Sequence, residues 1–215
     1  MIDLLSVLSI VMIVTSLLVF GLRNYKLSIF AYSFQTFILV SIFLLLSSTH
    51  LAEQLSVWAT IAFFTKVLLI PFILLRLIKK LDVVYEDEPV TGFFVSPIIA
   101  MGFSLAIAMS IYPIYLEFSM IKESVPLIAS ITIFMMGIFG FILRNSAIKQ
   151  ILAYCMFENG IHLSLALMAY NSPEIAELGI LTDAIFAVLI MSVLAQRFYK
   201  YFGSLDVSKA TELKG

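Results

Sequence analysis

The stretch CMFENGIHLSLALMAY, residues 155–170, combines two properties that oppose each other. Most of its side chains are apolar, as in a helix that crosses a lipid bilayer, yet Glu158, Asn159 and His162 lie close together within it. A charged residue at the centre of a membrane helix costs roughly 2.5–3.5 kcal/mol on insertion scales. The segment therefore predicts a membrane helix whose polar side chains contact other helices.

The rest of the chain is equally apolar. Of its 215 residues, 62% are hydrophobic and 13% are charged, whereas soluble domains are about half apolar and a quarter charged. A helix needs about 20 apolar residues to cross the bilayer, and in lipid its backbone polar groups must pair internally. The sequence predicts an all-α fold, a polytopic membrane helix bundle of about seven transmembrane helices. The predicted spans are 4–22, 27–48, 55–78, 92–115, 125–143, 149–170 and 175–200.

Several other classes of protein are disfavoured. Residues 1–26 lack a basic leader and a small-residue cleavage site, so they are expected to form a retained first helix and not a signal peptide. The single cysteine, Cys155, offers no disulfide framework and no Cys/His metal pattern. A net charge of -1 gives no reason to expect nucleic acid as a partner.

Basic residues are distributed unevenly between the predicted loops. Lys122 is the one basic residue of the second, fourth and sixth loops, and Lys66 falls inside a span. Cytoplasmic loops are enriched in lysine and arginine, which predicts an external N-terminus and a cytoplasmic C-terminus. The predicted cytoplasmic set is Arg23, Lys26, Arg76, Lys79, Lys80, Arg144, Lys149, Arg197, Lys200, Lys209 and Lys214.

Two polar segments fall on the same predicted side. The acidic run YEDEP, residues 85–89, is expected to be a solvated loop, with a docking contact for a soluble partner as the alternative. Residues 204–215 are expected to form a polar cytoplasmic tail that is frayed at its end.

Lys66, Glu158 and Asp183 are the three charged residues well inside the predicted spans. At about 1.5 Å per residue, Glu158 lies about 13 Å from the helix end at Lys149, Lys66 about 16 Å into its span and Asp183 about 12 Å into its own. In a hydrocarbon core about 30 Å thick, all three lie near the midplane. Left unpaired, they would together cost on the order of 8–10 kcal/mol. We therefore expect them to be paired, neutral or hydrated inside the bundle.

A polar stripe accompanies Glu158. Gln150, Tyr154, Glu158 and His162 recur every four residues, a spacing that places side chains on one face of a helix. The opposite face of this helix is expected to meet lipid. For Gln150 and Asn159, and to a lesser degree His162, hydrogen bonding between helices is the competing interpretation.

The chemistry of these side chains favours proton movement. Burial disfavours the charged form of an ionisable group, which brings carboxylates and amines closer to neutrality, and histidine titrates near neutral pH already. We predict Glu158 and Asp183 as relay groups of a proton path. His162, one turn from Glu158, would hydrogen bond or hand on a proton, and Lys66 would modulate the acids.

Three segments carry a resemblance to known families. The segments are MMGIFGFILRNSAIKQ (135–150), YCMFENGIHLSLALMAYN (154–171) and ELGILTDAIFAVLIMSVLAQRFYK (177–200). Through them, residues 125–200 resemble the K subunit of bacterial complex I, and the whole chain resembles the component E family of hydrogenase-4.

The match to the K subunit can be followed residue by residue. Gly137, Gly140, Arg144 and Asn145 match a G-x-x-G helix that ends in a basic residue and asparagine. Glu158 matches the mid-membrane glutamate of the next helix but comes one turn later, a shift of about 6 Å in depth. Asp183 stands in place of the glutamate of the third helix.

A weaker match involves the third span. Lys66 precedes Pro71 by five residues, as in a Lys-x4-Pro motif of the antiporter-like subunits of complex I. Pro71 is expected to kink its helix and to free a carbonyl near Lys66.

The resemblance implies a function and a division of the chain. The chain would be a redox-inactive, non-catalytic subunit of a complex-I-like energy-converting hydrogenase, in the cytoplasmic (inner) membrane of a bacterium or archaeon. It would carry no cofactor, and iron–sulfur clusters and a nickel–iron site would lie on partner subunits. Residues 1–115 would form an N-terminal four-helix membrane segment, 116–203 a three-helix segment like the K subunit, and 204–215 the tail.

Three other functions remain as alternatives. A K-like subunit of a multisubunit sodium/proton antiporter is one, although the four N-terminal spans count against it. A structural brace between membrane subunits is the second. A retinal-type receptor is a remote third, because its Schiff-base lysine would be expected in the last span, whereas Lys66 lies in the third.

Overall fold

The computed structural model describes residues 4–50, 52–86, 92–170 and 174–212 and contains seven helices long and apolar enough to cross a membrane. The predicted all-α, seven-span fold is therefore confirmed. The helices are α1 (Leu4–Gly21), α2 (Tyr25–His50), α3 (Glu53–Ala62), the π-helix η1 (Phe63–Leu69), α4 (Ile70–Leu81), α5 (Val95–Phe118), α6 (Ser124–Leu143), α7 (Ala147–Met168), α8 (Glu174–Phe202) and a short 3-10 helix η2 (Val207–Glu212). α3, η1 and α4 follow one another without a break and form the third span.

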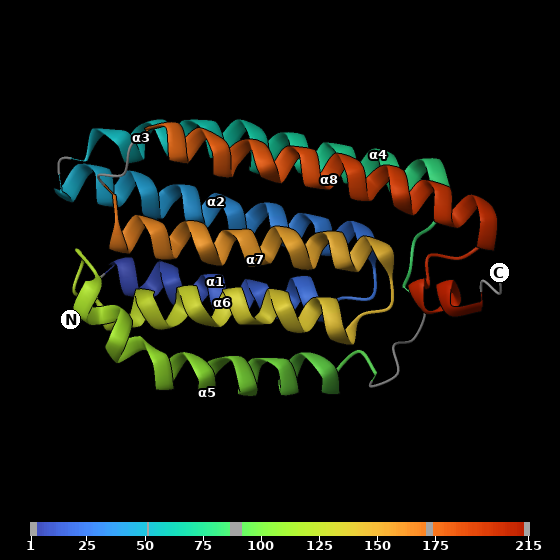
Figure 1. Ribbon diagram of the computed structural model, residues 1–215, viewed down its shortest axis with the longest axis horizontal. Coiled ribbons are helices and arrows are strands. Elements are labelled where there is room, and N and C mark those ends of the chain that lie inside the picture. Colours follow the sequence, from blue (N-terminus) through green and yellow to red (C-terminus); the bar gives the residue numbers. More distant parts are fainter. Residues whose placement is uncertain (1–3, 51, 87–91, 171–173, 213–215) are drawn as a thin grey trace.

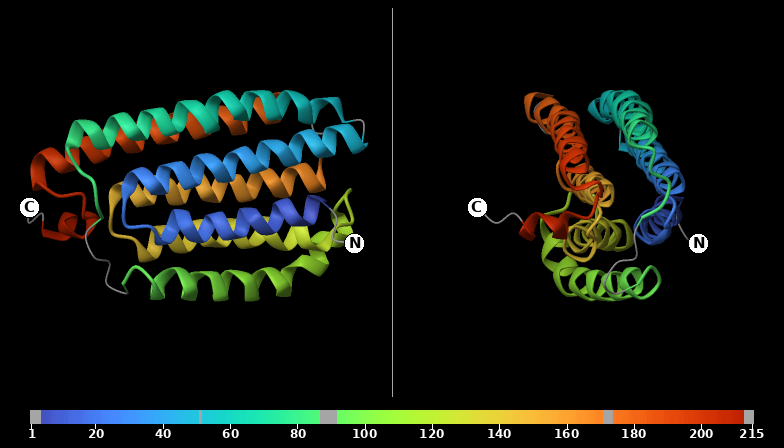
Figure 2. Two further views of the ribbon diagram at one scale, coloured as in Figure 1. Left: turned by 180° about the vertical axis from the view of Figure 1, so that it is seen from behind. Right: turned by 90° about the vertical axis from the view of Figure 1, so that its right-hand side faces the viewer.

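The helices form two facing rows, each of three spans (Figures 1 and 2). α1, α2 and α4 make one row, and α6, α7 and α8 make the other. α1 packs against α6, α2 against α7, and α4 against α8, while α5 lies beside α6 at the edge of the bundle. A buried hydrophobic core continues across both rows.

One end of the bundle collects the turns that the sequence predicted to be basic. A β-bridge joins Asn24, in the α1–α2 turn, to Tyr85, after α4. A second bridge joins Ser146, in the α6–α7 turn, to Asp206, in the tail. Lys122 lies in the α5–α6 turn at the opposite end. The basic residues therefore share one end, and the side of the membrane that this end faces stays a prediction.

The tail continues the bundle as far as it is described. The Ala147 amide donates to the Leu205 carbonyl at 3.0 Å, and the Val207 amide to the Asn145 carbonyl at 2.8 Å. Leu205 is buried, so the first part of the tail is docked against the α6–α7 turn. The end of the tail, which was expected to be frayed, lies outside the described residues.

The third span departs from regular geometry at Lys66. The π-helix η1 surrounds this residue and ends just before Pro71. Proline cannot donate to the carbonyl four residues earlier, which is that of Val67. The Ser33 hydroxyl of α2 donates to this carbonyl at 2.9 Å, so the freed acceptor is satisfied by the neighbouring helix. π-Helical turns occur often at functional sites.

Glycine allows α6 and α7 to approach closely. A Cβ atom on Gly137 would lie 2.6 Å from the Cα atom of Phe157, and one on Gly160 would lie 2.5 Å from the backbone nitrogen of Phe134. Small residues at such contacts are a common way for membrane helices to pack, because their backbones can then come together.

α7 lies at the centre of the bundle, which corrects one expectation. The half-buried residues of α7 lie on the side that carries Gln150 and Tyr154, whereas the opposite side, which was predicted to meet lipid, is buried. The stripe is also not straight: Gln150 and Tyr154 are half-buried, whereas Glu158 and His162 are buried. With 3.6 residues per turn, a four-residue step advances about 40° around the helix. Three such steps turn the stripe by about 120°, from the surface into the interior.

Candidate functional site

The centre of the site is an ion pair between the two rows. Lys66 Nζ, from η1, lies 3.3 Å from Glu158 Oε2, from α7. Lys66 is 0% exposed and Glu158 is 5% exposed. Both residues are near the middle of their spans, Glu53–Leu81 and Ala147–Met168. The pairing offsets the energetic cost of burying a single charge in the membrane, and it is one of the arrangements that we expected from the sequence.

His162 and Asn159 also contact the ammonium group of Lys66. Lys66 Nζ is 3.0 Å from His162 Nδ1 and 3.4 Å from Asn159 Oδ1. His162 Nδ1 also lies 2.7 Å from the Glu158 carbonyl. Nδ1 cannot donate to that carbonyl and accept from lysine at once. The ring therefore has two competing hydrogen-bonding states, and its Nε2 atom has no partner among the described residues that would select one.

Asn159 extends the polar contacts to the N-terminal row. Its Nδ2 atom donates to Thr36 Oγ1 at 2.9 Å and to Gln35 Oε1 at 3.2 Å, both on α2. Gln35 Nε2 in turn donates to Ser16 Oγ of α1 and, at 3.3 Å, to the Met12 carbonyl. All of these side chains are buried. A continuous line of polar groups therefore runs from Lys66 and α7 across α2 to α1.

Sequence reasoning missed the part of this line on α1 and α2. Gln35 sits in an apolar run, YSFQTFILV (32–40), and an isolated amide in such a run was the available signal. Ser16 carried no such signal, because serine occurs throughout these spans and its hydroxyl can bond within its own helix. It also donates to the Met12 carbonyl at 2.9 Å.

Asp183 does not join this cluster. It is exposed on α8, at the outer surface of the chain, and has no hydrogen-bond or ion-pair partner within the described part of the chain. Tyr154 precedes Glu158 by one turn of α7 and is close enough to Glu158 and Asp183 to be influenced by the charge of each. The structure thus brings together Lys66, Glu158 and His162 and leaves Asp183 outside the cluster.

A second buried cluster lies at the basic end. Arg144 Nη1 is 3.3 Å from Glu86 Oε2, and Arg144 Nη2 donates to the Phe20 carbonyl at 2.6 Å. Lys149 Nζ donates to the Val19 carbonyl at 2.8 Å and the Leu22 carbonyl at 2.6 Å. These carbonyls end α1, where a helix has unsatisfied acceptors and a partial negative charge. The two cations therefore cap α1.

Glu86 corrects the expectation of a solvated acidic loop. It is 2% exposed and pairs with a guanidinium that is 1% exposed. Burial lowers the pKa of Arg144 from its usual value, and the Glu86 carboxylate opposes this shift. The other residues of the acidic run, 87–89, lie outside the described residues.

Glu86→Gln should destabilise the chain, because it leaves the buried Arg144 guanidinium without a counter-charge. A hydrogen bond to a charged group contributes about 1.5–3 kcal/mol, so we expect a clear drop in the thermal midpoint of the chain in detergent. Glu117→Gln, an exposed carboxylate at the end of α5, is the matched control and should leave the midpoint unchanged. Equal midpoints for the two variants would show that the Glu86–Arg144 pair does not stabilise the fold.

The central cluster has the composition of a proton-transfer site. It contains a carboxylate, an amine and an imidazole in contact, and each can hold or release a proton. Within the described residues no group of three or more His, Cys, Asp and Glu side chains could hold a metal ion. Cys155 is buried.

Comparison with known proteins identifies relatives over nearly the whole chain. The family model for NADH-ubiquinone/plastoquinone oxidoreductase chain 4L matches residues 125–215. Hydrogenase-4 component E of Escherichia coli (strain K12) is 38% identical over 205 residues, covering 95% of this chain and 94% of that protein. Its counterpart in Shigella flexneri matches equally. An uncharacterised protein of Mycobacterium tuberculosis is 29% identical over 151 residues, covering 69% of this chain and 68% of that protein. No solved structure matches the chain.

Proposed function

This chain belongs to the hydrogenase-4 component E family and is a multi-pass membrane subunit of a complex-I-like hydrogenase, and from this premise we propose that it moves protons through the Lys66–Glu158–His162 cluster. In this role the subunit is redox-inactive. Iron–sulfur clusters and a nickel–iron site belong to partner subunits, and the complex resides in the cytoplasmic membrane of a bacterium or archaeon.

The buried Lys66–Glu158 pair is the observation that carries the proposal. Removing two charges from water is expensive, and replacing a buried ion pair by apolar residues is often neutral or even stabilising. Ionisable residues inside membrane proteins are accordingly rare and commonly mark proton or ion pathways. A chain that needed only a helix contact here would be served equally well by leucine and methionine.

The geometry suggests how a proton would pass. Lys66 can give a proton to Glu158, and His162 Nδ1 lies within hydrogen-bonding distance of Lys66 Nζ. When lysine is charged it donates to the ring, and when it is neutral the ring can donate to the Glu158 carbonyl. A change of one proton therefore changes which contact His162 makes. The line through Asn159 and Gln35 fixes the cluster, because amides orient charged neighbours without titrating.

Asp183 would serve at the next stage of the path. Its exposed position on α8 suits a residue that meets another membrane subunit, and Tyr154, one turn from Glu158 on α7, is within electrostatic range of both carboxylates. In this proposal residues 116–203 supply the two carboxylates, while residues 1–115 supply Lys66 and the polar side chains that hold the cluster in place.

Tyr154→Phe and Asp183→Asn should each lower turnover-coupled proton translocation several-fold and leave the amount of assembled complex unchanged. The measurement is acidification of inverted membrane vesicles during hydrogenase turnover. If both residues serve one path, the double variant should translocate as many protons per turnover as the more impaired of the two single variants. Tyr112→Phe, on α5, is the matched control for loss of a hydroxyl.

The same vesicles separate this proposal from its alternatives. A structural brace predicts that these variants lower the amount of assembled complex and leave translocation per turnover unchanged. A K-like antiporter subunit predicts a sodium-dependent pH change in the absence of turnover. Either result would replace the proposed function.

A further inference from the structure

A groove lined by cations lies between the ends of α4 and α8. It has a volume of about 640 Å³, and its described lining contains Lys80, Arg197 and Lys200 but no acidic residue. Lys80 Nζ donates to Gln196 Oε1 at 2.7 Å and so joins the two helices. Arg197 and Lys200 are exposed and make no ion pair within the described part of the chain. The groove therefore presents positive charge that no described residue of the chain neutralises.

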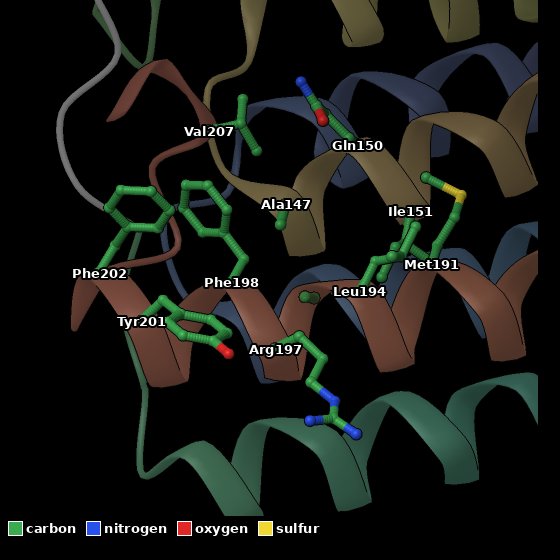
Figure 3. Close-up of a pocket in the computed structure, with 11 residues that line it drawn as sticks. Ala147, Gln150, Ile151, Met191, Leu194, Arg197, Phe198, Tyr201, Phe202 and Val207 are labelled. Atoms are coloured by element: carbon green, nitrogen blue, oxygen red, sulfur yellow. The ribbon is translucent and has the colours of Figure 1, made fainter. Parts of the chain in front are cut away.

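An apolar groove begins on the other side of the same part of α8. It has a volume of about 370 Å³ and lies between α7, α8 and the docked tail. Figure 3 shows Arg197 extending toward α4, while Phe198 and Val207 lie on the side of the tail and the start of α7. Arg197 lines both grooves. The apolar groove is lined chiefly by Ile151, Met191, Leu194, Phe198, Phe202 and Val207.

Both grooves lie at the ends of membrane-spanning helices, where lipid headgroups are expected. α4 ends at Leu81 and α8 at Phe202, so Lys80, Arg197 and Lys200 fall within the last two turns of their helices. Basic side chains at this level extend toward the interface, and tyrosine is enriched there. Tyr201, which is 80% exposed, fits the second pattern.

We propose that these two grooves together bind one anionic glycerophospholipid. Lys80, Arg197 and Lys200 hold its phosphate, and an acyl chain lies along the apolar groove beside α8. The charge and shape of the grooves match this ligand, which is negative at one end and apolar at the other. Basic pockets between transmembrane helices are known to select anionic headgroups. The inference does not depend on the proposed proton path.

The test uses the full chain, delipidated in a mild non-ionic detergent, with bound lipid counted by native mass spectrometry. We expect phosphatidylglycerol to bind at least ten-fold more tightly than phosphatidylcholine with the same acyl chains. The triple variant Lys80→Gln, Arg197→Gln, Lys200→Gln should bind phosphatidylglycerol as weakly as phosphatidylcholine. Lys26→Gln, an exposed lysine at the start of α2, is the matched control and should bind as the wild type does.

Two further measurements make the result independent of the triple variant. High salt screens exposed charges, and about 0.5 M sodium chloride shortens the Debye length to roughly 4 Å. This salt concentration should weaken phosphatidylglycerol binding to the wild type and leave phosphatidylcholine binding unchanged. Glycerol 3-phosphate, which has the anion without the chains, should fail to displace the lipid. Equal binding of the two lipids, an unaffected triple variant, or displacement by glycerol 3-phosphate would overturn the proposal.

Discussion

Glu158→Gln should abolish proton translocation coupled to hydrogenase turnover. Glutamine keeps the shape of the side chain but cannot accept a proton at this position, so the relay would be broken at its central group. We expect at least a ten-fold loss of acidification per turnover in inverted vesicles. Glu117→Gln, on the exposed end of α5, should translocate as the wild type does.

The stability of the same variant tests the ion pair separately. Removing one partner of a buried pair costs about 3–5 kcal/mol when the remaining charge stays uncompensated. Glu158→Gln should therefore also lower the thermal midpoint, because Lys66 remains buried beside it. Adding Lys66→Met removes that charge and should restore the midpoint without restoring translocation. Recovery of both properties in the double variant would contradict the relay.

Gly160→Ala should prevent normal packing of α6 against α7. The added Cβ atom would lie 2.5 Å from the backbone nitrogen of Phe134, and a backbone atom cannot move aside as a flexible side chain can. Overpacking of this kind costs about 1–3 kcal/mol and occasionally more. We expect the folded chain recovered from membranes to fall several-fold.

Gly102→Ala is the matched control for that substitution. A Cβ atom on Gly102, within α5, would meet nothing within 4 Å. Alanine is favoured over glycine inside a helix by about 0.5–1 kcal/mol, so this variant should be at least as stable as the wild type. If Gly160→Ala and Gly102→Ala were recovered equally, the close approach of α6 and α7 would not be required for the fold.

The number of helices was predictable because each membrane-spanning helix has its own apolar run in the sequence. An apolar run of about 20 residues suffices, whatever it packs against. The resemblance to hydrogenase-4 component E was likewise carried by local segments. Grouping the basic turns at one end followed from alternation through seven crossings, and the structure agrees with it.

The partners within the site were less predictable because they depend on packing between rows. Depth along the helix placed Lys66 and Glu158 at one level, and they do pair. Depth alone also placed Asp183 there, but the rotation of α8 turns it outward. Rotation also explains why the polar stripe on α7 was mispredicted as straight. Each four-residue step turns about 40° around the helix axis, and these turns add up along the stripe.

The charge pattern predicted the wrong burial for charged residues that are covered by segments distant in the chain. Glu86 belongs to an acidic run that is typical of a solvated loop, and its burial requires Arg144, 58 positions further along the chain. Similarly, Arg144 and Lys149 contributed to the topology prediction as loop residues, yet both are buried against the end of α1. Long-range contacts of this kind leave no local signal in a single sequence.

The most direct test of the proton path is the Lys66→Met, Glu158→Gln double variant in inverted vesicles, with acidification and hydrogenase turnover recorded together. This variant removes both charges, so a change in translocation cannot be attributed to one stranded buried ion. The proposed function predicts an assembled complex that continues to turn over but acidifies the vesicles at least ten-fold less per turnover. Acidification per turnover equal to that of the wild type would contradict it.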